Sequence, residues 1–144
     1  MCYLDRSHNN YALGHGHYGY TFSLGDGDGV FHAVSKKMKL VTLSSTESEY
    51  VAICEACREA VFLRGVLEDL GFKQKRPTKM WEDNKSTIAM VGGSAQHQAS
   101  KHINPKFHFS RECVAKGVVR VDWKATTEMI ADVLTKPLAK DAHK

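Results

Sequence analysis

The sequence predicts a single α/β domain that is built on a mixed sheet. The chain has 144 residues, of which 42% are hydrophobic and 25% are charged, and this suits one domain with a real core. Turn-forming residues divide the chain into segments that predict the element order β-β-β-α-β-α-α-β-α. The early strands follow one another as a meander, whereas the later strands alternate with helices, which implies parallel pairing.

Three strands are expected in the first part of the chain. Residues 2–7 read as a short strand, and "HYGYTFSL" (17–24) alternates well enough for a second strand. The turn sequence "GDGDG" (25–29) then leads into "VFHAVSKK" (30–37) as the third strand. GDGDG also resembles a calcium loop, but it lacks the later acidic ligands of an EF-hand.

Helices and strands alternate in the rest of the chain. A long helix is expected over about 46–70, and Gly71 ends it. The remaining expected elements are, in order, a strand within "PTKMWED" (77–83), helices over "NKSTIAMV" (84–91) and roughly 105–116, a strand over "VVRVDW" (118–123) and a last helix over "TTEMIADVLTK" (126–136). No internal repeat or long linker interrupts this order.

The chain is mildly basic, with a formal net charge of +4 and a pI near 8.9. Its basic residues are clustered in "SKKMK" (35–39), "KQKRPTK" (73–79), "KHINPKFHFSR" (101–111) and the last nine residues. Basic clusters beside aromatic residues suit a polyanion such as nucleic acid. A merely solvated basic surface is the alternative.

Neither a membrane segment nor a secretion signal is expected. No apolar run approaches the ~20 residues that a membrane helix needs. The start, "MCYLDRSHNN", has neither the basic n-region nor the apolar h-region of a signal peptide. Cys54 and Cys57 lie inside the expected long helix, where such a pair more often packs than bonds. A reducing, intracellular setting is therefore expected.

Two glutamates at the start of the long helix are distinguished by helical periodicity. At 100° per residue, the apolar stripe of the helix lies within roughly 40° of Glu49, whereas Glu47 points about 160° away from Glu49. A lone carboxylate on an apolar stripe is costly unless a metal ion, a base or a proton compensates it. Glu49 is therefore a functional candidate and Glu47 a solvated cap, although Thr46 and Glu49 also fit a capping box.

Three further acids complete a candidate site, and each has a structural alternative. Asp83 follows an expected strand, where sites collect in open α/β sheets, but it could instead cap the next helix. Asp132 is on the flank of the last expected helix and Asp5 is in the first strand, and both could be solvated acids. Four carboxylates that converge from separate elements are the usual way to hold two Mg²⁺ ions.

Four segments of the chain carry a resemblance to a known family. They are "LSSTESEYVAICEACREAVFLRGVLEDLGF", "EDNKSTIAM", "SKHINPKFHFSREC" and "MIADVLTKPL". In residues, order and spacing they closely resemble the ribonuclease H domain of Ty1/copia-type retrotransposon polyproteins. The resemblance implies a ribonuclease H-like fold, with a five-stranded mixed sheet flanked by helices, over one domain at 1–144. Residues 1–4 would be a truncated first strand and residues 139–144 a tail.

The resemblance implies an endoribonuclease that cuts the RNA strand of RNA–DNA hybrids by two-metal-ion hydrolysis during reverse transcription. The implied catalytic and metal-binding acids are Asp5, Glu49, Asp83 and Asp132, and the implied cofactor is two Mg²⁺ ions, with Mn²⁺ as a substitute. Nucleic-acid contacts are expected at Ser45, Thr46, Asn84, Lys36, Lys37, Lys101 and His102. The reverse transcriptase domain of the same polyprotein is the expected partner, and the cytoplasmic retrotransposon particle, or the nucleus, is the expected location.

Two rival functions stay open on the sequence. The first is a catalytically decayed or domesticated domain that keeps the fold and binds nucleic acid or a protein partner. A complete set of acids favours catalysis over this alternative. The second is a zinc module formed by Cys54, Cys57, His102 and His108. Its two halves are far apart in the sequence, and its cysteines fall in the middle of a helix.

Overall fold

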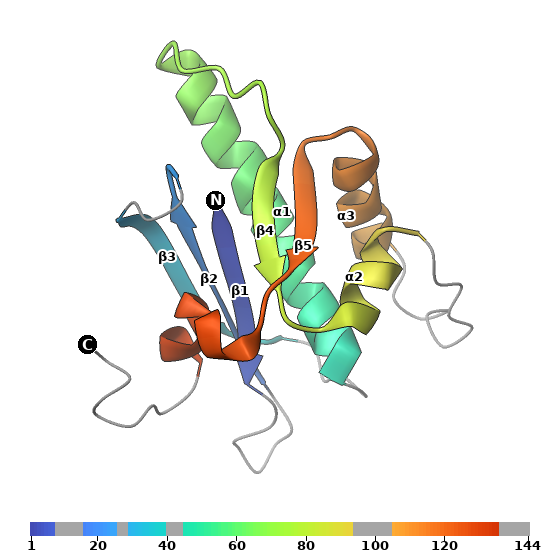
Figure 1. Ribbon diagram of the computed structural model, residues 1–144. Helices are drawn as coiled ribbons and strands as arrows, with labels where there is room; N and C mark the ends of the chain where they lie inside the picture. The colour runs from blue at the N-terminus through green and yellow to red at the C-terminus, as the bar shows by residue number, and fades with distance from the viewer. Residues whose placement is uncertain (8–15, 26–28, 40–44, 94–104, 136–144) are drawn as a thin grey trace.

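Five strands form one mixed sheet in the order β3-β2-β1-β4-β5 (Figure 1). The computed structural model describes residues 1–7, 16–25, 29–39, 45–93 and 105–135. The strands are β1 (Cys2–Ser7), β2 (His17–Ser23), β3 (Val30–Lys37), β4 (Thr78–Glu82) and β5 (Val119–Trp123). The pairs β1–β2 and β2–β3 are antiparallel, and the pairs β1–β4 and β4–β5 are parallel. The predicted meander, followed by parallel strands, is confirmed.

Three α-helices lie on one face of this sheet, and the last segment of the described chain lies on the other (Figure 1). The helices are α1 (Ser45–Asp69), α2 (Lys85–Val91) and α3 (Pro105–Ala115). The long helix α1 runs behind β1 and β4 and extends beyond the upper end of the sheet (Figure 1). Among the described helices, none is both long and apolar enough to span a bilayer.

The core lies between α1 and the sheet. Leu4, Met80 and Ile53 are fully buried there, from β1, β4 and α1 respectively. All four cysteines of the chain are buried free thiols, and burial raises the pKa of the Cys57 thiol. A thiol that resists ionisation packs as a small apolar side chain, as the helical spacing predicts for Cys54 and Cys57.

The prediction of one α-helix over 126–136 is wrong. The chain forms two short 3₁₀ helices instead, η2 (Thr126–Glu128) and η3 (Ile130–Leu134), and Met129 between them is extended, with φ −85° and ψ 101°. This break turns Met129 and Ala131 onto the outer face of the sheet, where both are buried beside Tyr3. Ile130, which the helical pattern places on an apolar face, is exposed.

A glycine in β2 allows this last segment to approach the sheet closely. A Cβ added to Gly19 would lie 2.8 Å from the Cβ of Leu134 and 3.0 Å from Cγ2 of Thr135. The hydroxyl of Ser35, on β3, donates a hydrogen bond of 2.6 Å to the Leu134 carbonyl. These contacts hold the end of η3 against β1 and β2, near Asp5.

Candidate active site

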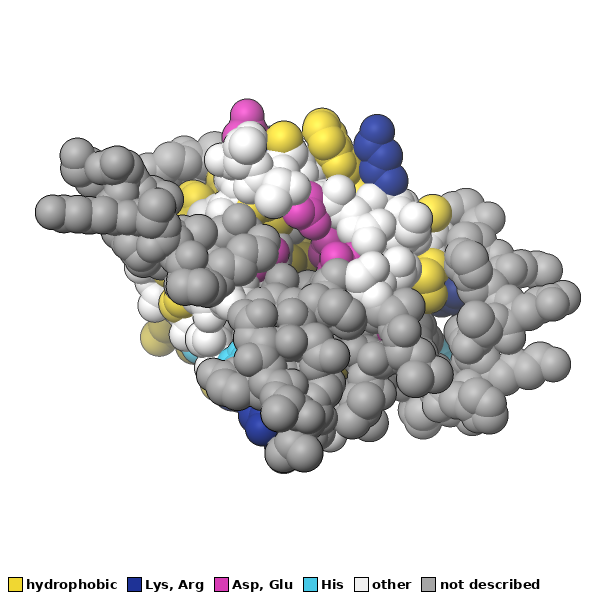
Figure 2. All heavy atoms as spheres, turned by 90° about the horizontal axis from the view of Figure 1, so that it is seen from below, with side chains coloured by type: hydrophobic (Ala, Val, Ile, Leu, Met, Phe, Trp, Pro, Cys, Tyr) yellow, Lys and Arg dark blue, Asp and Glu magenta, His cyan; other side chains and the backbone are white. Residues whose placement is uncertain are grey.

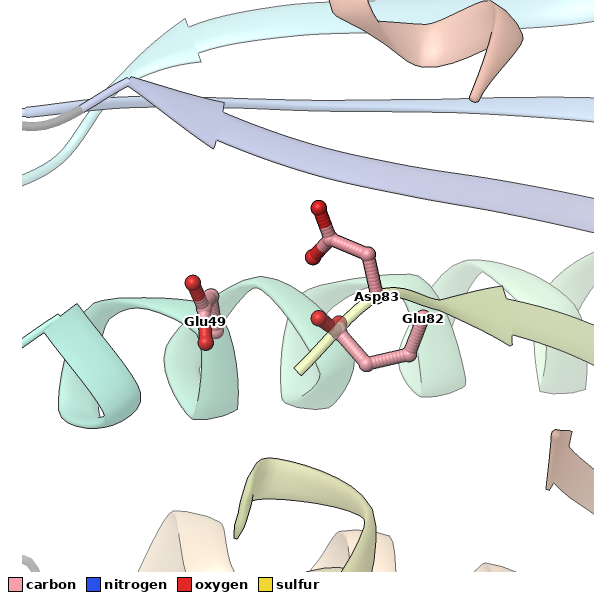
Figure 3. Close-up of side chains that lie close together, drawn as sticks. All are labelled: Glu49, Glu82 and Asp83. Atoms are coloured by element: carbon pink, nitrogen blue, oxygen red, sulfur yellow. The ribbon is translucent and has the colours of Figure 1, made fainter. Parts of the chain in front are cut away.

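Acidic side chains meet at the edge of the sheet where the parallel strands end. Glu49, Glu82 and Asp83 each offer a carboxylate oxygen, and these oxygens lie within 4.8 Å of one another. Figure 2 views this edge and shows the acidic side chains gathered near the middle of the face. Figure 3 shows that Glu49 comes from α1 and the other two from the end of β4, with Asp83 directed toward β1.

Glu49 is held at this edge by two hydrogen bonds from the start of α2. It is buried, with 9% of its surface exposed, as its place on the apolar stripe of α1 predicts. The side-chain amide of Asn84 and the hydroxyl of Thr87, at 2.9 Å for Thr87, both donate to Oε2 of Glu49. Since both donors meet the same oxygen, Glu49 is oriented from one side. Glu47, two residues earlier, is only partly buried.

Asn84, and not Asp83, is the N-cap of α2. Its Oδ1 accepts hydrogen bonds from the backbone N–H groups of Ser86 and Thr87, at 2.9 and 3.4 Å. Because Oδ1 accepts these bonds, the amide nitrogen of Asn84 is turned toward Glu49. The alternative reading of Asp83 as a helix cap is therefore wrong. One side chain both begins α2 and orients the glutamate of α1.

Asp83 directly follows β4 and is held by the segment that follows β5. The hydroxyl of Thr126 donates a 2.7 Å hydrogen bond to Oδ2 of Asp83. The indole N–H of Trp123 donates to the Asp83 backbone carbonyl at 3.1 Å. The side chain of Asp83 is partly exposed, so it is accessible from solvent while its backbone is fixed.

Glu82 is a member of the cluster that the sequence analysis missed. It is only 2% exposed, and its Oε1 accepts a 3.1 Å hydrogen bond from the Asn84 backbone N–H. Burial, reinforced by the negative charge of Glu49, raises the pKa of Glu82 well above the usual range of a glutamate. Strand alternation was the available signal, because Glu82 lies on the same face of β4 as the buried Met80.

Replacing Glu82 with Gln should raise the free energy of unfolding of the metal-free protein at neutral pH. The folded state holds the Glu82 proton to a higher pH than the unfolded state does. Wild-type stability should therefore fall as pH rises above about 4.5, through the folded pKa of this residue. Gln removes this dependence and can still accept the hydrogen bond from Asn84.

The measurement is denaturant unfolding of both proteins in EDTA between pH 4 and 8. The stability advantage of Glu82→Gln should be small at the acid end and grow toward neutral pH. Asp69→Asn, a change at an exposed acid at the end of α1, serves as the control and should show no such growth. An advantage that stays constant with pH would contradict the assignment of a perturbed carboxyl at Glu82.

Asp5 lies on β1, beside the strand that carries the cluster. Tyr3 pairs with Trp81 in parallel, and continuing this register by two residues brings Asp5 level with Asp83. Asp5 is buried, and its Oδ2 accepts a hydrogen bond from the hydroxyl of Thr135, which follows η3. The close approach of η3 at Gly19 makes this contact possible, because Gly19 is the β2 partner of Asp5.

The remaining predicted site residues are only partly placed by the structure. The backbone of Asp132 lies in η3, and its side chain is outside the described part of the structure, so its role as a fourth acid stays a prediction. Lys36 and Lys37 are exposed at the end of β3. Ser45 is exposed and Thr46 is partly buried in the first turn of α1. Lys101 and His102 lie outside the described residues.

The zinc alternative finds no support in the residues that can be compared. Cys54 and Cys57 are buried in the core, whereas His108 is exposed on α3. His102 lies outside the described residues. In the described residues, the group with ligand-like spacing is the carboxylate cluster of Glu49, Glu82 and Asp83. Carboxylate oxygens are the donors that hard divalent cations such as Mg²⁺ prefer, so this cluster fits such an ion.

Relatives with similar sequences are retrotransposon polyproteins from plants. The chain is 36% identical over 108 residues to the retrovirus-related Pol polyprotein from transposon RE1 of Arabidopsis thaliana, a match over 75% of this chain and 7% of the polyprotein. It is 35% identical over 123 residues to the Pol polyprotein from transposon TNT 1-94 of Nicotiana tabacum, over 85% of the chain and 9% of the polyprotein. The chain thus spans less than a tenth of these relatives. No family model matches it.

Solved structures with the same fold include ribonuclease H proteins and a viral reverse transcriptase. The N-terminal RNase H domain of rv2228c from Mycobacterium tuberculosis aligns over 98% of this chain and 90% of its own, with a TM-score of 0.66 and 15% identity. LC11-RNase H1, solved in complex with an RNA/DNA hybrid, aligns over 93% of this chain and 91% of its own, with a TM-score of 0.66 and 14% identity. The foamy virus protease–reverse transcriptase aligns over 94% of this chain and 20% of its own, with a TM-score of 0.59 and 15% identity. At these identities the likeness shows the fold.

Proposed function

Because the chain is a ribonuclease H-like domain of the retrotransposon Pol polyprotein kind, we propose that it cuts the RNA strand of RNA–DNA hybrids. The observation that carries the proposal is that Glu49 and Asp83 meet where the parallel strands have their C-terminal ends. Asp5 lies on β1, the strand next to β4. These are three of the four acids that the family resemblance implies. Glu49 comes from α1, Asp83 follows β4 and Asp5 comes from β1, so the three acids belong to separate parts of the sequence.

A pair of divalent ions, Mg²⁺ or Mn²⁺, would be held by Glu49, Asp83, Asp5 and Asp132. Such ions, when bound, activate water and stabilise the charge that develops on a scissile phosphate. Asn84 and Thr87 fix one oxygen of Glu49, and Thr126 fixes one oxygen of Asp83, so two of the ligands are oriented in advance. Thr135 does the same for Asp5.

The hybrid would be selected through 2′-hydroxyl contacts in its wide minor groove. Its sugar–phosphate backbone would be held by exposed basic side chains of the protein. Lys36 and Lys37 support this part of the proposal, because they are exposed at the end of β3, which runs parallel to β1 and ends at the same edge of the sheet as the acids. Asn84 is also at this edge, but its amide already bonds Glu49 and the start of α2. We assign Asn84 to positioning Glu49. In the polyprotein, the domain would work beside the reverse transcriptase.

A cleavage assay tests the proposal. The protein should cut a labelled RNA strand in a hybrid when Mg²⁺ or Mn²⁺ is added and should leave it intact in EDTA, with 5′-phosphate and 3′-hydroxyl products. The same RNA in a single strand or an RNA duplex should stay intact. The assay is run on this domain and on the domain joined to the preceding reverse transcriptase. Hybrid binding without cleavage in both forms would instead favour a non-catalytic module.

A further inference from the structure

Trp123 is an exposed aromatic side chain at the rim of the acidic cluster. It is the last residue of β5 and is 51% exposed. In the sheet it pairs with Glu82, the last residue of the neighbouring strand β4. Its indole N–H is fixed on the backbone carbonyl of Asp83, at 3.1 Å. A large apolar ring that stays half in solvent and is oriented by a hydrogen bond is available for contact with another molecule. Trp123 is in direct contact with the residue that would hold metal.

A lysine lies over the same ring. Nζ of Lys85, the first residue of α2, is 5.1 Å from the Trp123 ring centroid. Lys85 is exposed, and it forms no ion pair with an acid in the part of the chain that the structure describes. A cation and an aromatic face therefore adjoin one another next to the cluster, and Figure 2 shows hydrophobic and basic side chains side by side at the rim of the acidic face.

We propose that Trp123 and Lys85 form a contact for the sugar–phosphate backbone of the hybrid, next to the phosphate that is cut. This proposal rests on the proposed function. The bases of a duplex are stacked inside it, so a ring at the protein surface meets sugars, while the ammonium group meets a phosphate. The contact would help to bring a polyanion to a cluster of carboxylates that would otherwise repel it.

The other end of the molecule offers a matched comparison. Phe72, in the segment between α1 and β4, is 68% exposed, and Lys75 is an exposed basic residue near it in the sequence. Both follow the end of α1 that extends away from the acidic edge (Figure 1), so the structure separates this part of the basic cluster at 73–79 from the acids. Among the described cation–aromatic contacts, none involves Phe72. A general effect of exposed aromatic or basic residues on binding would appear equally at Phe72 and Lys75.

The first experiment uses Trp123 as a reporter. The chain has two tryptophans, so Trp81→Phe leaves Trp123 as the single indole fluorophore. A blunt RNA–DNA hybrid, titrated at low salt with EDTA so that no strand is cut, should quench its emission. If Trp81→Phe does not fold, the wild type labelled with fluorotryptophan gives two ¹⁹F resonances, which Trp123→Phe assigns. No response of the Trp123 signal at saturating hybrid would overturn the proposal.

The second experiment measures hybrid affinity in variants under the same conditions. Trp123→Leu should weaken binding roughly tenfold, because Leu covers less apolar surface of the sugars than the indole ring does. Trp123→Phe, which keeps a ring but loses the N–H, should stay within about threefold of the wild type. Affinity falls as salt rises, and Lys85→Gln should make this fall shallower, reducing the size of the slope of log affinity against log salt by about one. Phe72→Leu and Lys75→Gln should change neither quantity.

The outcomes separate this contact from the proposed function. If the wild type binds the hybrid but never cuts it, the proposed function fails and the contact is still tested by affinity. If Trp123→Phe and Trp123→Leu lose affinity equally, then the indole N–H that bonds Asp83 matters and the aromatic ring does not. That result would contradict the proposed contact between the ring and the hybrid. If quenching requires a single-stranded overhang, the ring stacks on an unpaired base and the backbone contact is likewise wrong.

Discussion

Asp83→Asn should reduce hybrid cleavage to below about a hundredth of the wild-type rate and leave the fold intact. Asn cannot supply the negative charge that a divalent ion needs, and loss of a ligand should exceed the ~10–100-fold effect of losing an outer hydrogen-bond partner. The fold should survive because Asn84, and not Asp83, caps α2. An Asn at position 83 can also still accept the hydrogen bond from Thr126 through its side-chain oxygen. The measurement is the single-turnover cleavage rate in Mg²⁺, with the unfolding midpoint recorded in EDTA.

Asp69→Asn is the matched control for this change. It makes the same chemical substitution at an exposed acid at the far end of α1, so it should leave the cleavage rate unchanged. Near-normal Mg²⁺-dependent cleavage by Asp83→Asn would mean that Asp83 holds no catalytic metal. A collapse of stability in EDTA would mean that its contacts with Thr126 and Trp123 are structural.

Most of the fold follows from local patterns in the sequence. Strand alternation, the glycines that end helices and the switch from meander to β-α alternation predict the order of the elements and the direction of every strand pair. The last helix is the exception, because its residues have a helical pattern but their conformation is set by distant contacts. Met129 has an extended backbone, and its side chain is buried beside Tyr3. Gly19, more than a hundred residues earlier in the chain, has no side chain and so leaves space for Leu134.

The site was predictable where a single element determines it. The place of Glu49 on the apolar stripe of α1 follows from periodicity, and its burial confirms the prediction. The hydrogen bonds from Asn84 and Thr87 depend on how α2 lies against α1, and no spacing in the sequence reveals them. The alternative that Asp83 caps α2 stays open on the sequence for a similar reason, since Asp and Asn cap equally well and only the turn geometry shows that Asn84 is the cap.

Glu49→Gln and Glu47→Gln should have opposite consequences, although they make the same substitution two residues apart in α1. Glu49 belongs to the carboxylate cluster, so Gln at this position should lower cleavage by more than about a hundredfold. The amide oxygen of Gln can accept the bonds from Asn84 and Thr87, and one negative charge beside Glu82 is removed. Stability in EDTA should therefore stay constant or rise. Glu47 is outside the cluster and lies in the first turn of α1, so its loss should cost at most ~1 kcal/mol of stability and no activity.

Added Mg²⁺ gives a second readout that does not depend on cleavage. A ligand that binds only the folded state raises stability by mass action, so Mg²⁺ should raise the unfolding midpoint of the wild type and of Glu47→Gln. The rise should be smaller for Glu49→Gln, because the ion loses one of its carboxylates. Equal losses of activity in the two variants, or a loss confined to Glu47→Gln, would show that the wrong face of α1 had been assigned to the site. An equal Mg²⁺ response in all three proteins would show that Glu49 orients the cluster without binding the ion.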